Sequence, residues 1–278
     1  DVTTSVAGLH VPSFALWASL YGRCLRIAIN NGFCFAGNAA LFGSADIRIA
    51  TKNSWIGMAG PAMIEGGGLG KFDPKEIGPS DIQKNNGVID YVAEDEKEAT
   101  IIAKKILSYF QGDIKDWKAD DQTQLSKIMP KDRRWSYPVR DIIKIISDIE
   151  EYTEIKPEYG KGIVTCFIRI EGKPFGLLAN DSQHLGGAID SEGADKASSF
   201  IEMCSEYGLP IISLVDTPGF MVGPDSEKEG AVRRMSNLFK IGSKVKVPLT
   251  AIFLRKGYGL GAQAMVGGSL HEPGYTAA

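Results

Sequence analysis

The sequence predicts an α/β protein built from two related domains. Apolar runs with strand character alternate with segments of helical periodicity, a pattern typical of strands joined by crossover helices. One kind of glycine-rich segment also occurs twice, at residues 31–43 and 256–267. With 278 residues the chain has room for two domains of ordinary size.

The first half is predicted to contain helices at both ends of a group of strands. An apolar stripe with helical spacing (Pro12, Phe14, Trp17, Leu20, Tyr21) precedes a strand that starts near Ile27. Three further strands are expected at 44–50, 55–61 and 86–92. Apolar residues then recur at helical spacing through 96–110, and Gly112 ends that helix.

The second half is predicted to begin after a polar connection at 112–137, where the periodicity is poor. Helices are expected at 139–149, 195–207 and 230–242. Strands are expected at 162–170, 174–179, 211–215 and 247–254.

The two glycine-rich segments favour the same local structure. Each follows an apolar strand and contains a Gly-aromatic pair, at Gly32 and at Gly257, before a small-residue run that starts a helix. Glycines at such a junction let backbone N–H groups converge, and the helix N-terminus adds positive partial charge. This arrangement stabilises an oxygen that becomes negative during a reaction. Close packing of a strand on a helix also uses Gly and Ala, so that alternative stays open.

Composition and charge narrow the function classes. Net charge is −3 with both signs interspersed, and no basic run suits nucleic acid. No apolar stretch approaches the ~20 residues of a membrane span. Four cysteines without CxxC spacing are expected to be buried and reduced, which suits the cytoplasm, and three distant histidines make a metal site improbable. The chain starts with Asp1 and is expected to be cut from something longer.

The sequence lacks complete motifs of nucleotide-binding proteins and of serine hydrolases. Asp216-Thr-Pro-Gly219 is similar to the switch motif of GTPases, and Gly68-Leu-Gly-Lys71 is similar to the end of a phosphate-binding loop. Such a loop requires Ser or Thr directly after its Lys, but Phe72 follows Lys71. No G-x-S-x-G elbow supports a serine hydrolase. The histidines are more typical of capping or packing; His184, in a Gly-rich loop, is the one kept as a candidate for chemistry.

Taken together, six segments resemble the carboxyltransferase subunits of biotin-dependent acyl-CoA carboxylases and decarboxylases. They occur in the family's order and cover nearly the whole chain. The segments are residues 35–40, 57–70, 128–130, 178–180, 214–220 and 255–265.

The resemblance implies two crotonase-like domains, each a superhelix of ββα units and each incomplete in this chain. Residues 1–125 would form the later part of the first domain, on the acyl-CoA side. Residues 126–278 would form the earlier part of the second domain, on the biotin side.

The resemblance also implies a reaction that needs no side-chain acid or base. Backbone N–H groups of Gly37 and Asn38 would hold the thioester oxygen of acyl-CoA, and those of Leu260 and Gly261 the ureido oxygen of biotin. Carboxybiotin would release CO2, its N1 would remove the α-proton, and the enolate would attack CO2. Further substrate-binding residues are expected at Ala36, Gly60, Pro61, Gly219, Phe220, Tyr258 and Gln263.

Gln263 has two interpretations. It falls where the family places a residue that governs acyl choice, yet it could equally be a helix residue that faces its own domain. No metal ligand is implied.

The expected function is therefore carboxyl transfer from N1-carboxybiotin to the α-carbon of a short acyl-CoA. Biotin would be carried by a biotin carboxyl carrier protein, with biotin carboxylase as a second partner and a dimer-based homo-oligomer, expected to be a hexamer. Alternatives are a sodium-pump type decarboxylase subunit that runs the reverse transfer, a crotonase-type hydratase, and a non-catalytic subunit of an acyl-CoA complex.

Overall fold

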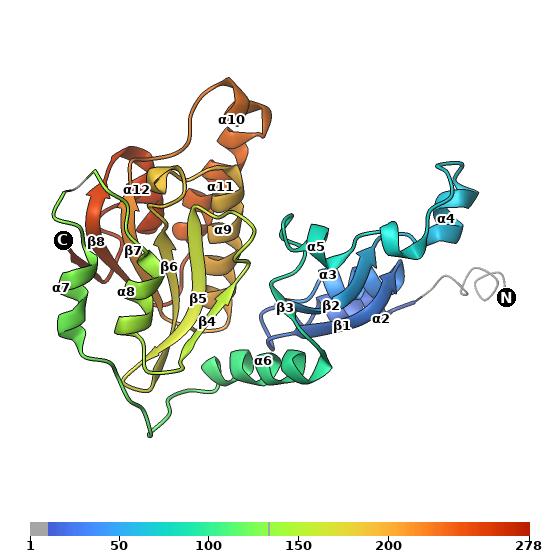
Figure 1. The fold of residues 1–278 in the computed structure, drawn as a ribbon, viewed down its shortest axis with the longest axis horizontal. Helices are drawn as coiled ribbons and strands as arrows, with labels where there is room; N and C mark the ends of the chain where they lie inside the picture. The colour runs from blue at the N-terminus through green and yellow to red at the C-terminus, as the bar shows by residue number, and fades with distance from the viewer. Residues whose placement is uncertain (1–10, 133) are drawn as a thin grey trace. The chain divides into compact units, whose positions relative to one another are not determined.

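The computed structural model describes residues 11–132 and 134–278, and the chain forms two compact units (Figure 1). One unit ends at Lys104 and the other begins at Lys105, within helix α6 (Glu96–Tyr109). The expected family boundary at 125/126 lies further along the chain, in the second unit, and stays a prediction. No described helix is long and apolar enough to cross a membrane.

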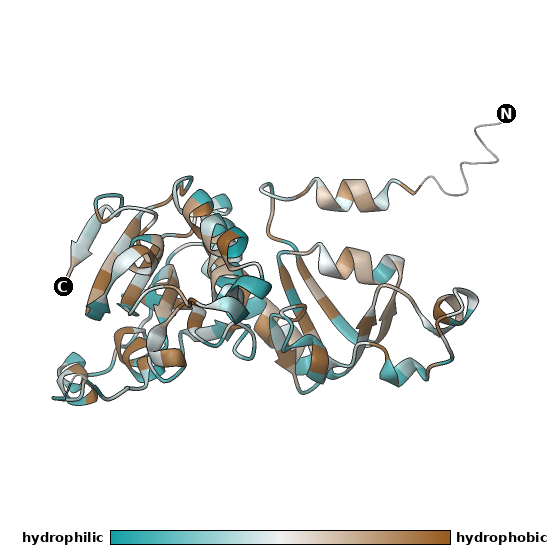
Figure 2. Cartoon of the chain, turned by 90° about the horizontal axis from the view of Figure 1, so that it is seen from above, coloured by the Kyte–Doolittle hydropathy of each residue, from teal (hydrophilic) through white to brown (hydrophobic). Residues whose placement is uncertain are grey.

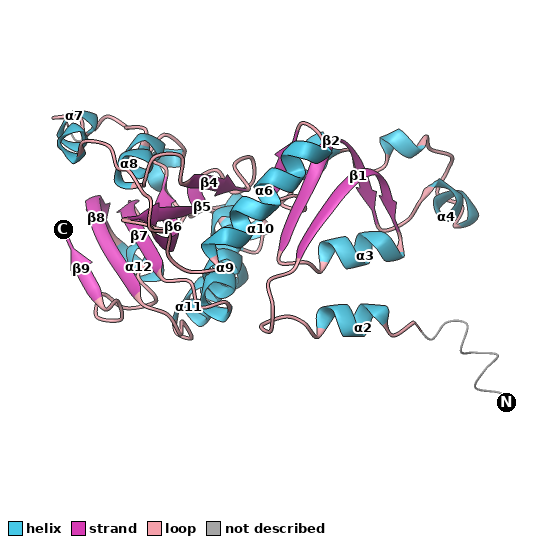
Figure 3. Ribbon diagram, turned by 90° about the horizontal axis from the view of Figure 1, so that it is seen from below, coloured by secondary structure: helices cyan, strands magenta, loops and turns pink. Residues whose placement is uncertain are grey.

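The first unit is built on a parallel sheet of order β1-β2-β3 (Ile27–Phe35, Ile47–Gly57, Tyr91–Ala93). Helix α3 (Gly37–Gly43) packs on this sheet, and α2 (Ser13–Ala18) lies beyond α3 (Figure 3). The remaining short helices are α4 (Pro61–Gly66), η1 (Pro74–Glu76) and α5 (Ser80–Gln83).

Strand β2 corrects one expectation. Separate strands were expected at 44–50 and 55–61, but one strand runs through the polar residues between them. Thr51 and Ser54 are buried there because their hydroxyls find acceptors on β1: Thr51 Oγ1 donates to Asn31 Oδ1 at 2.7 Å and Ser54 Oγ to the Asn30 carbonyl at 3.0 Å. Satisfied hydroxyls allow polar residues to continue a buried strand.

The second unit is built on a mixed six-stranded sheet of order β4-β5-β6-β7-β8-β9. The first three strands are antiparallel, and β6 to β9 are parallel. Their bounds are Tyr152–Ile155, Ile163–Ile170, Lys173–Asn180, Ile211–Thr217, Leu249–Gly257 and Tyr275–Ala277.

Helices cover both faces of this sheet (Figure 1). Helix α8 (Val139–Ile146) packs its apolar residues on β5, β6 and β7. Helix α9 (Ser191–Glu206) lies on the opposite face, where Phe200 contacts Phe167 of β5, and α11 (Ala231–Gly242) packs beside α9. Figure 2 shows the apolar residues that this burial requires along the strands. The second unit also contains η3 (Leu185–Gly187), α10 (Pro224–Lys228) and α12 (Gly259–Met265).

The segment expected as a polar connection, 112–137, belongs to the second unit instead. It contains η2 (Gln122–Gln124) and α7 (Leu125–Ile128), and Leu125, Ile128 and Met129 pack against the core under α8. The expected burial of all four cysteines was wrong for one of them: Cys34, Cys166 and Cys204 are buried, but Cys24 is exposed.

Candidate functional site

The first glycine-rich segment forms a strand–helix junction. Strand β1 ends at Phe35, and α3 starts two residues later at Gly37. An α-helix leaves its first N–H groups without partners inside the helix, and α3 has no side-chain cap. Among the residues that the structure describes, neither the Gly37 nor the Asn38 N–H has an acceptor. Two adjacent donors are therefore free at this junction.

Ala36 holds this junction in a strained turn. Its φ is +54° and its ψ −122°, a region that residues with a Cβ rarely adopt. Its N–H donates to the Gly57 carbonyl at 3.2 Å, which ties the turn to the end of β2. Strain of this kind is retained where the surrounding structure over-determines it, often at functional sites.

Gly60 and Pro61, also expected at the substrate site, lie beside the same junction. A Cβ on Gly60 would approach the Phe35 ring to 3.3 Å, so this glycine allows the loop to pack on the end of β1. Pro61 is the first residue of α4. The structure thus brings Ala36, Gly37 and Gly60 close to Phe35.

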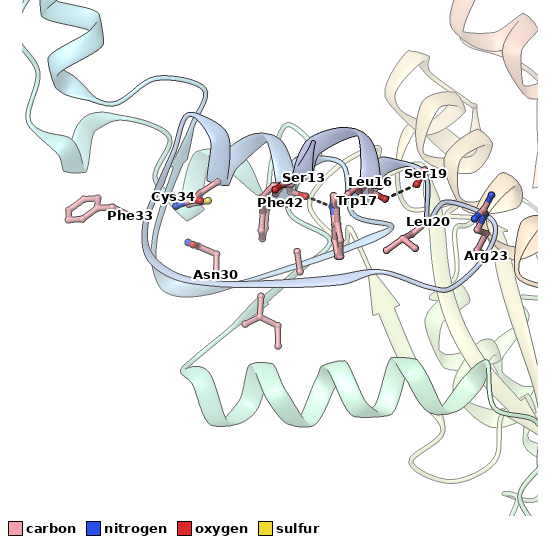
Figure 4. Close-up of a pocket in the computed structure, with 14 residues that line it drawn as sticks. Ser13, Leu16, Trp17, Ser19, Leu20, Arg23, Asn30, Phe33, Cys34 and Phe42 are labelled. Carbon is pink, nitrogen blue, oxygen red and sulfur yellow. Dashed lines mark hydrogen bonds between the residues drawn. The ribbon is translucent and has the colours of Figure 1, made fainter. Parts of the chain in front are cut away.

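An apolar cavity of about 830 Å³ lies between α2, α3 and β1 (Figure 4). Figure 4 shows Trp17 and Phe42 pointing into the space above the strand, and the Trp17 indole donates to the Leu41 carbonyl at 2.9 Å. Asn38 lines this cavity together with Phe33 and Cys34. The exposed Asn38 therefore adjoins a largely apolar hollow.

The sequence missed Phe14 as a neighbour of this site. It was assigned only to the apolar stripe of the first helix. A Cβ on Gly37 would lie 3.1 Å from the Phe14 ring, so the ring covers the start of α3.

The second glycine-rich segment forms a matching junction in the second unit. Strand β8 ends at Gly257 and α12 starts at Gly259, whose φ is +60°. Within the described chain, no acceptor takes the N–H of Leu260 or Gly261. Leu260 and Tyr258 are both 61% exposed, whereas Gly261 is buried, so the two donors lie in a turn that carries exposed Tyr258 and Leu260 side chains.

Gly219 packs directly on this junction. A Cβ on Gly261 would lie 2.7 Å from Gly219 Cα and 3.0 Å from the Phe220 nitrogen. Tyr258 N–H donates to the Thr217 carbonyl at 3.1 Å. The structure therefore brings four expected residues together: Gly219, Phe220, Tyr258 and Gly261.

The two junctions match, although not in the register that the sequence suggested. The Gly-aromatic pairs at Gly32 and Gly257 do not occupy equivalent places. Gly32 lies inside β1, at φ +90° beside an irregularity in its pairing with β2, whereas Gly257 ends β8. The equivalent positions are the helix starts, Gly37 and Gly259.

Gln263 is exposed on α12, so its side chain does not pack into the core of its own unit. His184 is partly buried, and its Nε2 lies 3.7 Å from an Asp190 carboxylate oxygen. No group of three His, Cys, Asp or Glu residues in the described ranges could hold a metal ion.

Comparison with known proteins gives a consistent match. A model of the carboxyl transferase domain family matches residues 10–277. The methylmalonyl-CoA carboxyltransferase 12S subunit of Propionibacterium freudenreichii subsp. shermanii is 32% identical over 249 residues, 86% of this chain and 48% of that protein. A biotin-dependent acetyl-/propionyl-coenzyme A carboxylase beta6 subunit of Mycobacterium tuberculosis is 31% identical over 244 residues, 85% of this chain and 52% of that protein.

Two solved structures are also similar. A single-chain, multi-domain long-chain acyl-CoA carboxylase superposes with a TM-score of 0.94 at 50% identity, over 98% of this chain and 28% of that one. The transcarboxylase 12S structure, a hexamer with methylmalonyl-CoA bound, superposes with a TM-score of 0.82 at 31% sequence identity. The match covers 91% of this chain and 51% of that one. This likeness confirms the predicted α/β, crotonase-like fold. The chain spans about half the length of the curated relatives it matches.

Proposed function

Since this chain belongs to the carboxyl transferase domain family, we propose that it catalyses carboxyl transfer between N1-carboxybiotin and the α-carbon of an acyl-CoA. One observation carries the proposal: each unit has a strand–helix junction with two adjacent backbone N–H groups that no described residue accepts. Paired donors of this kind stabilise an oxygen that gains negative charge. A carboxyl transfer of this type requires two such oxygens, one on each substrate.

The first junction is proposed to bind the thioester. The N–H groups of Gly37 and Asn38 would donate to the thioester oxygen, which becomes negative as the α-proton leaves. The strained Ala36 fixes the direction of these donors before the substrate binds, so little reorganisation is needed during the reaction. The apolar cavity beside Asn38 supports the presence of a hydrocarbon group at this junction.

The second junction is proposed to bind biotin, with Leu260 and Gly261 donating to the ureido oxygen. Its residues fit a ring of that kind, because the turn that carries these two donors also carries the exposed Tyr258 and Leu260 side chains. When bound, carboxybiotin would supply the CO2 and a basic nitrogen. The protein would therefore supply orientation and charge stabilisation rather than a proton donor.

Partners follow from the same proposal. A biotin carboxyl carrier protein would deliver the biotin, biotin carboxylase would recharge it, and the chain would act in a homo-oligomer, as the hexameric 12S protein does. All four cysteines are free, which suits the proposed cytoplasmic location. Relatives are named for methylmalonyl, acetyl or propionyl and long-chain substrates, so the acyl group stays open.

The reverse direction is the second candidate. A methylmalonyl-CoA decarboxylase subunit alpha of Veillonella parvula is 27% identical over 84% of this chain. The same two sets of donors would serve either direction, since both pass through the same enolate.

Transfer of labelled carboxylate in the assembled complex tests the proposal. Purified complex would receive biotin carboxylase, biotinylated carrier, ATP and labelled bicarbonate, with a panel of acyl-CoAs from two to sixteen carbons. We expect label in the acyl-CoA only when the carrier is biotinylated. Incorporation of label without biotin would contradict the proposed function. So would the absence of label from every acyl-CoA, if the reverse transfer from a carboxylated acyl-CoA to biotin is also absent.

A further inference from the structure

Asp216 is a fully buried carboxylate that the proposed chemistry does not use. It lies next to the end of β7, the strand between β6 and β8, and all three run parallel. The carboxyl ends of parallel strands meet at one edge of a sheet. Asp216 therefore lies centrally at the edge that carries the second junction.

Strand β8 is irregular opposite this residue. Val215 pairs with Phe253 and Thr217 with Gly257, so Leu254 to Lys256 lie opposite Asp216 alone. Extra residues in one strand interrupt the ladder and leave backbone groups without their usual partners. The strand therefore needs another acceptor just before it ends.

The Asp216 carboxylate supplies that acceptor. Its Oδ1 accepts the Lys256 backbone N–H at 2.9 Å. Two residues after Lys256, the Tyr258 N–H donates to the Thr217 carbonyl at 3.1 Å. The backbone is thus held on both sides of Gly257. Leu260 and Gly261, with their free N–H groups, follow directly.

Two cations compensate the buried charge. The Arg255 Nη2 lies 3.1 Å from Asp216 Oδ2, and the Lys256 Nζ lies 3.9 Å from Oδ1 and donates to the Gly186 carbonyl. Two contacts hold the Arg255 guanidinium in place. Its Cζ lies 5.0 Å from the centre of the Tyr137 ring, and its Nη1 donates to the Trp135 carbonyl.

Asp216 is itself fixed from the other side. Its backbone N–H donates to Asn180 Oδ1 at 3.1 Å, at the end of β6. Gly187 leaves no room for movement, because a Cβ there would lie 2.3 Å from the Asp216 carbonyl oxygen. The Asp216 carboxylate is thus held in a fixed position among the ends of β6, β7 and β8.

We infer that Asp216 is a positioning residue for the biotin-side junction, which it holds by accepting the Lys256 N–H and pairing with Arg255 and Lys256. A buried ion pair is often no better for stability than apolar packing, so its presence indicates a requirement for position. This inference rests on the proposed function of the second junction. If Asp216 is replaced, the Leu260 and Gly261 donors lose their fixed direction.

Three variants in the assembled complex test the inference. Asp216→Ala removes the acceptor and the charge, while Asp216→Asn keeps an acceptor for Lys256. Asp148→Asn is the matched control: Asp148 is also buried in the same unit and accepts the Glu171 and Gly172 N–H groups at 3.0 and 2.7 Å, at the opposite end of β6 from the second junction. The readouts are kcat/KM for biotinylated carrier and Kd for acyl-CoA by calorimetry.

We expect Asp216→Ala to lower kcat/KM for the carrier by about 10- to 100-fold, below the ~10²–10³ of deleting a donor outright. Asp216→Asn should retain a higher kcat/KM than Asp216→Ala, and the Kd of both variants for acyl-CoA should lie within twofold of the parent's. Asp148→Asn should match the parent in both readouts. Equal losses for the Asp216 and Asp148 variants, or parent-like kinetics of Asp216→Ala, would overturn the inference. A parent complex without any transfer would instead refute the proposed function.

Hydrogen exchange keeps the inference testable if Asp216→Ala does not fold. In Asp216→Asn, which loses the charge that pairs with Arg255 and Lys256, the hydrogen-bonded amides of Lys256 and Tyr258 should exchange at least tenfold faster than in the parent, and those of the β5–β6 turn at the parent rate. Unchanged exchange at Lys256 and Tyr258 would overturn the positioning role independently of any activity.

Discussion

Gly219 and Gly261 touch backbone to backbone: a Cβ on Gly261 would lie 2.7 Å from the Cα of Gly219. The contact joins the loop after β7 to the first turn of α12. Both residues are buried, whereas their neighbour Leu260 is exposed. Glycine at position 261 is therefore required by a neighbouring backbone that no side-chain movement can relieve.

Gly261→Ala is expected to disrupt the second junction. Overpacking of this kind costs about 1–3 kcal/mol, and moving the first turn of α12 would displace the Leu260 N–H as well. We expect carboxyl transfer to fall at least tenfold and the denaturation midpoint to decrease. Gly43→Ala is the control, since a Cβ there meets nothing within 4 Å and should leave both measurements close to the parent. Parent-like transfer by Gly261→Ala would contradict the proposed role of this junction.

Most of the regular elements could be predicted because their apolar periodicity is strong. Helix α6 and strands β5 and β7 were found almost to the residue. Short elements were missed: β4, β9, α4, α5 and α10 each span six residues or fewer, too few to establish a period. Segment 112–137 was assigned to a connection because its few apolar anchors, such as Leu125 and Met129, are too widely spaced to show which core they join.

The two strand–helix junctions were predicted from their glycines, and the roles proposed for their residues stay predictions. These glycines indicate strand–helix junctions, since glycine tolerates the close contact found at Gly261 and the positive φ found at Gly259. Ala36 could not be recognised in this way, because nothing in its residue type indicates a φ of +54°. Asp216 was read as part of a motif that fails, since its role depends on three strand ends meeting, and only the tertiary structure brings Asn180 and Lys256 to it.

Two substitutions at Asn38 separate a backbone donor from a side-chain role. Asn38→Pro removes the N–H and is expected to reduce transfer by about 10²–10³. Asn38→Ala keeps the N–H, so we expect a loss of less than about tenfold. Transfer kinetics with saturating biotinylated carrier would measure both. Equal losses for the two variants would assign the role to the Asn38 side chain.

Exchanging Gln263 tests its link with acyl choice. Its side chain is exposed on α12 and is free to reach a substrate rather than its own core. We expect Gln263→Ile and Gln263→Asp to change the ratio of kcat/KM values between acyl-CoAs in opposite directions, by about 10-fold or more for a chain that differs by several methylenes. Carboxylation of the carrier by biotin carboxylase serves as the control and should not change. An unaltered acyl preference in both variants would remove Gln263 from the site.

Lys196 predicts a pH dependence of stability in the second unit. Burial lowers its pKa to about 7, from an ordinary value near 10.5, and its Nζ donates to the Lys156 and Tyr159 carbonyls. Between these two pKa values the unfolded chain binds a proton that the folded chain does not. The free energy of unfolding should therefore rise with pH above about 7, with a slope of up to about 1.4 kcal/mol per pH unit.

The useful window for this measurement ends near pH 8.5. Burial raises the pKa of Cys166 and Cys204, so ionisation of cysteines in the unfolded chain lowers stability at higher pH. Urea denaturation from pH 7 to 8.5 should show the rise in the parent and in Lys161→Met, which loses a surface charge, but not in Lys196→Met. Removing the buried amine is expected to lower stability throughout, since two carbonyls lose their donor, so the slope rather than the midpoint decides. A slope that persists in Lys196→Met would show that another group titrates in this range.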